Sequence, residues 1–118
     1  MIRDRALRVI LVLAGLLFVG AVYPLTLFFR KEPSLAMMFS VYTTLGIFLL
    51  AAARSPQAHR SLIAFTAWSS LAHAGLMAAQ VYRQVIGRVE LPGVAVFAVI
   101  GAALLALAPR PSAVPAAR

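Results

Sequence analysis

Polar side chains gather on one face of the apolar segment that follows Pro56. At about 100° per residue, Ser69, Ser70, His73 and Gln80 fall within about 100° of arc on a helix. An ionisable side chain inside an apolar segment is a candidate functional site. The chemistry it indicates is hydrogen bonding to a ligand headgroup or a quinone, or the transfer of a proton. The simpler interpretation, which the sequence favours, is a neutral histidine hydrogen-bonded to a hydroxyl group.

The neighbouring apolar segments extend this polar set. If they cross a bilayer as antiparallel helices, the middle of segment 33–53 lies at the depth of His73, and Tyr23 of segment 9–29 lies slightly beyond it. The candidate pocket predicted by depth consists of Tyr23, Tyr42, Thr43, Thr44, Ser69, Ser70, His73 and Gln80. Matching depth predicts that these side chains can meet, not that they face one another.

Small side chains occupy the opposite face of the same segment. Ala72, Gly75 and Ala79 recur there at helical spacing. Small residues allow helices to approach closely inside a membrane. We therefore expect this face to pack against another helix, either within the chain or across an interface with another protein.

Catalytic and metal-binding constellations are missing from the sequence. It has no cysteine, and its three carboxylates, Asp4, Glu32 and Glu90, all lie at the edges of apolar segments. No third group is therefore placed to orient a Ser–His pair or to complete a metal site. Haem ligation by His59 and His73, about 21 Å apart along one helix face, lacks a partner histidine. We expect no enzyme, no metal and no cofactor.

The composition indicates what positions these residues. Hydrophobic residues make up 63% of the chain and charged residues 12%, whereas soluble domains are about half apolar and about a quarter charged. Four apolar segments have the length of about 20 residues that a helix needs to cross a bilayer. Lipid satisfies no free backbone group, so these segments must be helical. The sequence predicts an all-α membrane protein, a four-transmembrane-helix bundle over 1–108, with spans at about 9–29, 33–53, 56–82 and 91–108 and a Pro/Ala-rich cytoplasmic tail at 109–118.

Prolines mark the helix boundaries. Pro33, Pro56 and Pro92 lie at or near predicted helix starts, where the missing N–H costs nothing. Pro24 lies inside the first span and removes a backbone hydrogen bond there. It predicts a kink near residues 22–24 or an early end of the helix.

The basic residues predict the orientation. The end that carries both termini and the 54–60 connection has seven arginines: Arg3, Arg5, Arg8, Arg54, Arg60, Arg110 and Arg118. The other end has four basic residues, Arg30, Lys31, Arg83 and Arg88. The positive-inside rule places both termini in the cytoplasm. We expect these charges to contact anionic lipid headgroups and not nucleic acid, because they form no basic helix face.

Three segments carry a resemblance to known proteins. LRVILVLAGLLFVGAVYPL, TLGIFLLAAARSPQAHRS and AWSSLAHAGLMAAQ resemble a small bacterial family of uncharacterised four-helix membrane proteins. The general layout is similar to the wider DoxX-like group of short inner-membrane proteins. The resemblance covers about residues 5–108 and implies a bacterial inner-membrane four-helix bundle. It supplies no catalytic residues.

Two functions remain open from the sequence. The first is a non-catalytic accessory or assembly component that acts through helix packing, as a homo-oligomer or with a membrane-protein partner. The second is a binder or transporter of a small molecule, lipid or quinone, with a midplane pocket around His73.

Overall fold

A computed structural model describes residues 2–109 as helices joined by short turns. The elements in chain order are α1 (Ile2–Val19), α2 (Val22–Leu27), α3 (Pro33–Ala52), the 3-10 turn η1 (Pro56–His59), α4 (Arg60–Tyr82), the 3-10 turn η2 (Arg88–Glu90) and α5 (Leu91–Leu107). Four stretches are long and apolar enough to cross a membrane: Ile2–Leu27, Pro33–Ala52, Pro56–Tyr82 and Arg88–Leu107. Over residues 2–109, the prediction of an all-helical chain with four such helices is confirmed. Residues 110–118 of the predicted tail lie outside the described residues.

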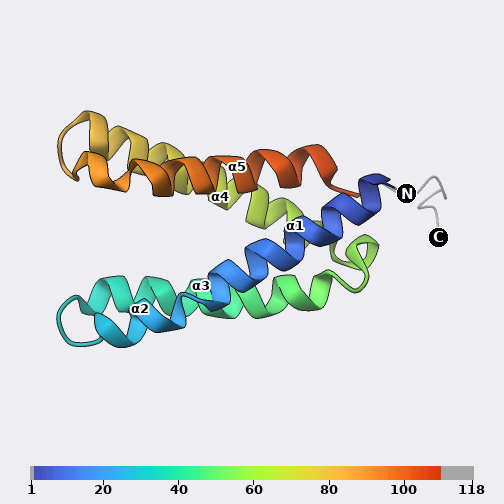
Figure 1. Ribbon diagram of the computed structural model, residues 1–118, viewed down its shortest axis with the longest axis horizontal. Coiled ribbons are helices and arrows are strands. Elements are labelled where there is room, and N and C mark those ends of the chain that lie inside the picture. The colour runs from blue at the N-terminus through green and yellow to red at the C-terminus, as the bar shows by residue number, and fades with distance from the viewer. Residues whose placement is uncertain (1, 110–118) are drawn as a thin grey trace.

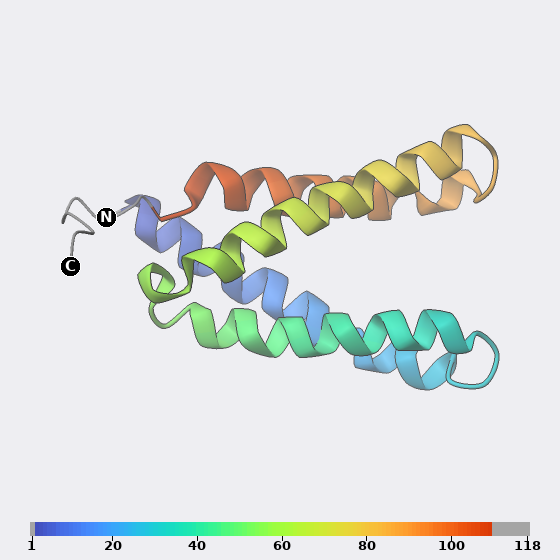
Figure 2. The same cartoon turned by 180° about the vertical axis from the view of Figure 1, so that it is seen from behind.

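The helices form two hairpins that diverge. α1 and α2 pack on α3, and α4 packs on α5 (Figure 1). α1 runs obliquely and also contacts α5, which joins the hairpins at the end where α1 begins and α5 ends. Seen from behind, α3 and α4 diverge from the turn that connects them (Figure 2). The hairpins are therefore close at one end and apart at the other.

The first membrane-length stretch is broken where Pro24 predicts it. α1 ends at Val19 and α2 begins at Val22. Pro24 has no N–H to bond the carbonyl of Gly20, so that carbonyl accepts from the N–H of Tyr23 instead, at 3.1 Å. After the break, α2 packs on α3.

Glycines set the closest helix crossings. A Cβ on Gly46 of α3 would lie 2.6 Å from the backbone nitrogen of Val19 and 2.7 Å from the carbonyl oxygen of Gly15. A Cβ on Gly101 of α5 would lie 2.8 Å from the carbonyl oxygen of Ala67. Within each hairpin, one helix therefore touches the backbone of its neighbour, which only glycine permits.

The buried core lies toward the end where the hairpins meet. Leu7 and Leu11 of α1 pack with Leu49, Ile63 and Leu104 of the three other long helices, and all five are nearly inaccessible. Large apolar side chains elsewhere, such as Phe48, Phe65 and Trp68, are mostly exposed. An apolar exterior of this kind suits hydrocarbon better than water.

Arginines close the same end of the molecule. The guanidinium groups of Arg3 and Arg60 donate to the carbonyl oxygens of Ala108 and Pro109 at 2.9 and 3.3 Å, and Arg8 donates to the carbonyl of Arg54 at 3.2 Å. Cations at a helix C-terminus satisfy free carbonyls and oppose the helix dipole. α1 begins at Ile2, earlier than the predicted start of the first span at residue 9.

Candidate functional site

One hydrogen bond links the two hairpins at the point where they separate. The hydroxyl oxygen of Tyr42, on α3, lies 3.0 Å from Nδ1 of His73, on α4. Both side chains are half-buried. If the hydroxyl donates, Nε2 of His73 carries the ring proton. If Nδ1 donates, the tyrosine hydroxyl proton is free instead. In either arrangement the pair keeps one donor and one acceptor for another molecule.

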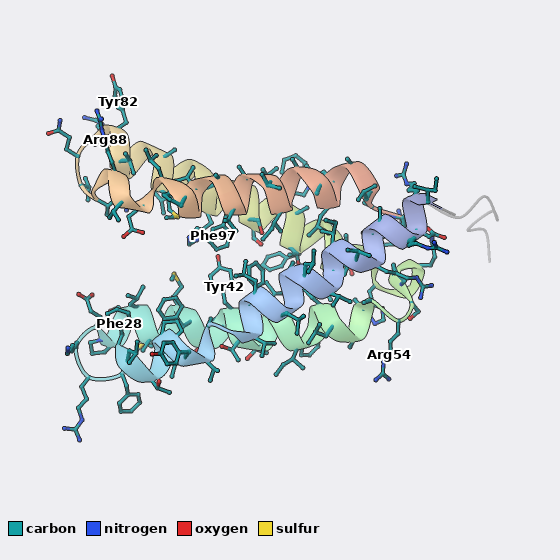
Figure 3. The ribbon with its side chains drawn as sticks, viewed as in Figure 1. Phe28, Tyr42, Arg54, Tyr82, Arg88 and Phe97 are labelled. Atoms are coloured by element: carbon teal, nitrogen blue, oxygen red, sulfur yellow. The ribbon has the colours of Figure 1, made fainter. Side chains whose placement is uncertain are left out.

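Aromatic rings surround this pair. The ring of Phe97, on α5, lies 4.2 Å from that of His73 at an interplanar angle of 37°. Phe18, on α1, contacts the edge of Tyr42 at 5.1 Å and also stacks near Phe97 at 5.9 Å. Figure 3 shows Tyr42 and Phe97 reaching toward each other from opposite hairpins. Four helices thus contribute one ring each to a single cluster.

A cleft opens from this cluster between the hairpins. Its volume is about 780 Å³, and Tyr42, His73 and Phe97 line it. The rest of the lining is mainly apolar and includes Phe18, Gly20, Ala21, Phe28, Met38, Phe39, Met77 and Val96. Gln80 and Glu90 are the other polar residues that line it. A mainly apolar cleft with a few convergent polar groups has the form of a small-molecule site.

The structure brings together three of the eight residues of the predicted pocket: Tyr42, His73 and Gln80 all line the cleft. The hydroxyls of Thr43, Thr44 and Ser69 donate to carbonyls of their own helices, those of Phe39, Ser40 and Thr66. Ser70 is buried, and it does not line the cleft.

Tyr23 lies away from the site, with 68% of its surface exposed. The break between α1 and α2 turns this side chain outward. Position along the helices therefore did not predict the direction in which each side chain points.

Among the cleft residues that sequence reasoning missed are Phe97 and Glu90. Phe97 is the only aromatic residue of α5, and Glu90 is the acidic residue just before that helix. An isolated aromatic ring in an otherwise aliphatic helix was the available signal for Phe97. Nothing in the sequence indicated that Glu90 lies on the cleft side, because that depends on the rotation of α5 about its axis.

The small-residue face of α4 is on the outer surface of the chain. Ala72, Gly75 and Ala79 are exposed, and a Cβ on Gly75 would meet no atom within 4 Å. Close packing within the chain uses other small residues, Gly15, Gly46 and Gly101. The face stays free, in one copy of the chain, for contact with lipid or with another protein.

The described part of the chain, residues 2–109, contains no group of three His, Cys, Asp or Glu side chains that could hold a metal ion. His59 lies in η1, where its Nδ1 is 3.0 Å from the carbonyl oxygen of Ser55.

Comparison with known proteins gives a family. The model of DUF6632, a family of unknown function, matches residues 3–117. The chain belongs to DUF6632. The match covers nearly all of the described residues, and the whole cleft lies within it. The expectation of an uncharacterised family is confirmed. No curated protein and no solved structure matches the chain.

Proposed function

We propose that this DUF6632 protein is an integral membrane protein that binds a small, neutral amphiphile in the cleft between its hairpins. The polar head of the ligand lies beside Tyr42 and His73. The observation that carries the proposal is the 3.0 Å contact between these side chains across a mainly apolar cleft of about 780 Å³.

The lining supports a neutral head with a carbonyl or hydroxyl group. The Tyr42–His73 pair offers one donor and one acceptor in both arrangements of its protons. The aromatic rings of Phe18 and Phe97 favour a flat or apolar group beside the pair. Among the described residues that line the cleft, Glu90 is the one carboxylic acid, and none is a lysine or an arginine. A quinone ring and the glycerol ester of a lipid both meet these requirements.

Binding to two defined probes tests the proposal. Dimethoxy-methyl-benzoquinone and monoolein are titrated into the protein in nanodiscs, and binding is followed by saturation-transfer NMR. Tyr42→Phe and His73→Phe remove the hydrogen-bonding groups, and each lost bond weakens binding by about 0.5–1.5 kcal/mol, up to about tenfold in Kd.

Thr44→Val is the matched control. Its hydroxyl bonds its own helix, and the residue does not line the cleft. The control is expected to bind the probes like the unchanged protein. If neither probe binds, or if Thr44→Val weakens binding as much as Tyr42→Phe, the cleft is not the binding site.

A second candidate function is that of an accessory or assembly component. The exposed Ala72, Gly75 and Ala79 on α4 favour it, because small residues permit a partner helix to approach closely. Native mass spectrometry of the gently extracted protein tests this function. A dimer or hetero-complex that Gly75→Leu disrupts supports it, whereas a monomer with no partner contradicts it.

The proposed location is the inner membrane of a bacterium, with both termini in the cytoplasm. The greater number of arginines at the end that holds Arg3, Arg8, Arg54 and Arg60 supports this orientation. Anionic headgroups are the proposed neighbours of these side chains. The proposed relation to DoxX-like proteins has only the general four-helix layout in its support.

A further inference from the structure

A second apolar space begins where the cleft ends. It is a groove of about 380 Å³ between α1 and α5, called here the α1–α5 groove. Its walls include Ile10, Leu13 and Leu17 of α1 and Val96, Val99 and Ala103 of α5. Every side chain that lines it is apolar. Its lining runs from residue 10 to residue 17 on α1 and from residue 95 to residue 103 on α5, a length on the order of 10 Å along each helix.

The groove and the cleft are adjacent. Leu17 and Val96 line both spaces, so they form the boundary between them. The break between α1 and α2 lies beside this boundary, since Gly20 and Ala21 line the cleft. A molecule with its head at Tyr42 and His73 therefore has this groove as the neighbouring apolar space, on the other side of Leu17 and Val96.

The groove is open along its outer side. The side chains of Leu13 and Val99 are 58% and 64% exposed. In a bilayer this side faces hydrocarbon, so a chain can enter laterally and needs no aqueous path.

We infer that the ligand is a single-chain amphiphile whose apolar chain lies in the α1–α5 groove while its head is held beside Tyr42 and His73. The inference rests on the proposed function and names the class of its ligand. The polar head requires the cleft, where the donor and acceptor are. The chain requires an apolar space next to the cleft, and the α1–α5 groove is that space.

Another groove of similar volume provides a control for labelling by chance. The α3–α4 groove has a volume of about 360 Å³. It is lined by Phe65 of α4 and by five residues of α3: Ser40, Val41, Thr44, Leu45 and Phe48. It shares no lining residue with the cleft. Ordinary lipid chains cover both grooves alike, because lipid tails are as apolar as the side chains. Only a chain attached to a bound head distinguishes the grooves.

Photolabelling from the chain end tests the inference. Two probes carry the same alkyl chain with a terminal diazirine, one on a benzoquinone ring and one on a glycerol ester. The protein in nanodiscs is irradiated with each probe, digested and analysed by mass spectrometry. The expected label lies on residues 10–17 and 96–103. It falls about tenfold when excess chainless benzoquinone competes for the head site, or in the variant His73→Phe.

Two variants of α5 separate blocking of the groove from damage to the helix. Ala103→Phe fills the groove and is expected to remove the label, while the chainless ring still binds. Its neighbour Ala102 is exposed and does not line the groove, so Ala102→Phe is expected to keep the label. The probe that is labelled in this pattern identifies the head as a quinone ring or a glycerol ester.

Two results would overturn the inference in different ways. Equal labelling of both grooves, unaffected by a chainless ring that does bind, would refute the position of the chain and leave the proposed function standing. Failure of the chainless ring and of both chain-bearing probes to bind would remove the proposed function, and the chain site with it.

Discussion

Replacing Gly46 by alanine tests how tightly α1 and α3 cross. The added Cβ would lie 2.6 Å from the backbone nitrogen of Val19, 2.7 Å from the carbonyl oxygen of Gly15 and 2.9 Å from a methyl carbon of Val19. The first two are backbone atoms, which cannot rotate away as a side chain can. The helices must therefore separate or shift to accept one methyl group.

The magnitude follows from two opposing effects. Overpacking by a methyl group that cannot be relieved costs about 1–3 kcal/mol. Alanine gains up to about 1 kcal/mol over glycine in helix propensity. Gly75→Ala makes the same change in the middle of α4, where no atom lies within 4 Å of the new Cβ. The propensity gain is common to both variants, so their difference in free energy of unfolding isolates the steric cost at about 1–3 kcal/mol.

Reversible unfolding in mixed detergent micelles measures this difference. The fraction of SDS is raised and the loss of native structure is followed by near-UV circular dichroism for the two variants and the unchanged protein. Gly46→Ala is expected to unfold at a lower SDS fraction than Gly75→Ala, which should match or exceed the unchanged protein. Equal midpoints for the two variants would show that α1 and α3 do not cross at Gly46 as described.

Three further predictions concern the bond between the hairpins, the arginines and the orientation. Tyr42→Phe should lower the free energy of unfolding by about 0.6 kcal/mol, because it removes the bond to His73. A double-mutant cycle with His73→Leu should give a coupling free energy of the same size. A coupling free energy of zero would mean that the two side chains do not bond. Arg3→Gln together with Arg60→Gln should speed amide hydrogen exchange in the last turn of α5, because each lost bond costs about 0.5–1.5 kcal/mol, while Arg88→Gln at the other end should leave it unchanged. Because the chain has no cysteine, single cysteines in the variants Arg54→Cys and Arg88→Cys can be labelled with a membrane-impermeant maleimide in intact cells. Only the Arg88→Cys variant should react. Labelling of the Arg54→Cys variant alone would invert the proposed orientation.

The polar residues show where reasoning from depth succeeds. Tyr42 and His73 were placed at the same level from their positions in two spans, and in the structure their side chains are bonded. Thr43 and Thr44 are at that level too, yet each bonds a carbonyl four residues earlier in its own helix. A short hydroxyl side chain can satisfy itself this way inside its own helix, whereas the phenol of Tyr42 and the imidazole of His73 bond each other across the two hairpins. Long polar side chains are therefore better predictors of contact between helices than serine or threonine.

The small residues give the complementary lesson. Ala72, Gly75 and Ala79 have the spacing of a packing face, but the close crossings use Gly15, Gly46 and Gly101. A helix offers its small residues on several sides, and which side meets a neighbour depends on how the neighbour is rotated. Spacing along one helix contains no information about that rotation.

The sequence by itself determined four membrane-length helices, the break near Pro24 and a polar position at His73. Each follows from a local cause: an apolar run of sufficient length, a missing N–H, or an ionisable ring in an apolar segment. The tertiary structure alone decided that the hairpins diverge, that Phe97 and Glu90 line the cleft, and that Tyr23 points away from it. These features depend on crossing angles and helix rotations, which are set by contacts between residues far apart in the chain, such as Gly15 with Gly46 and Ala67 with Gly101.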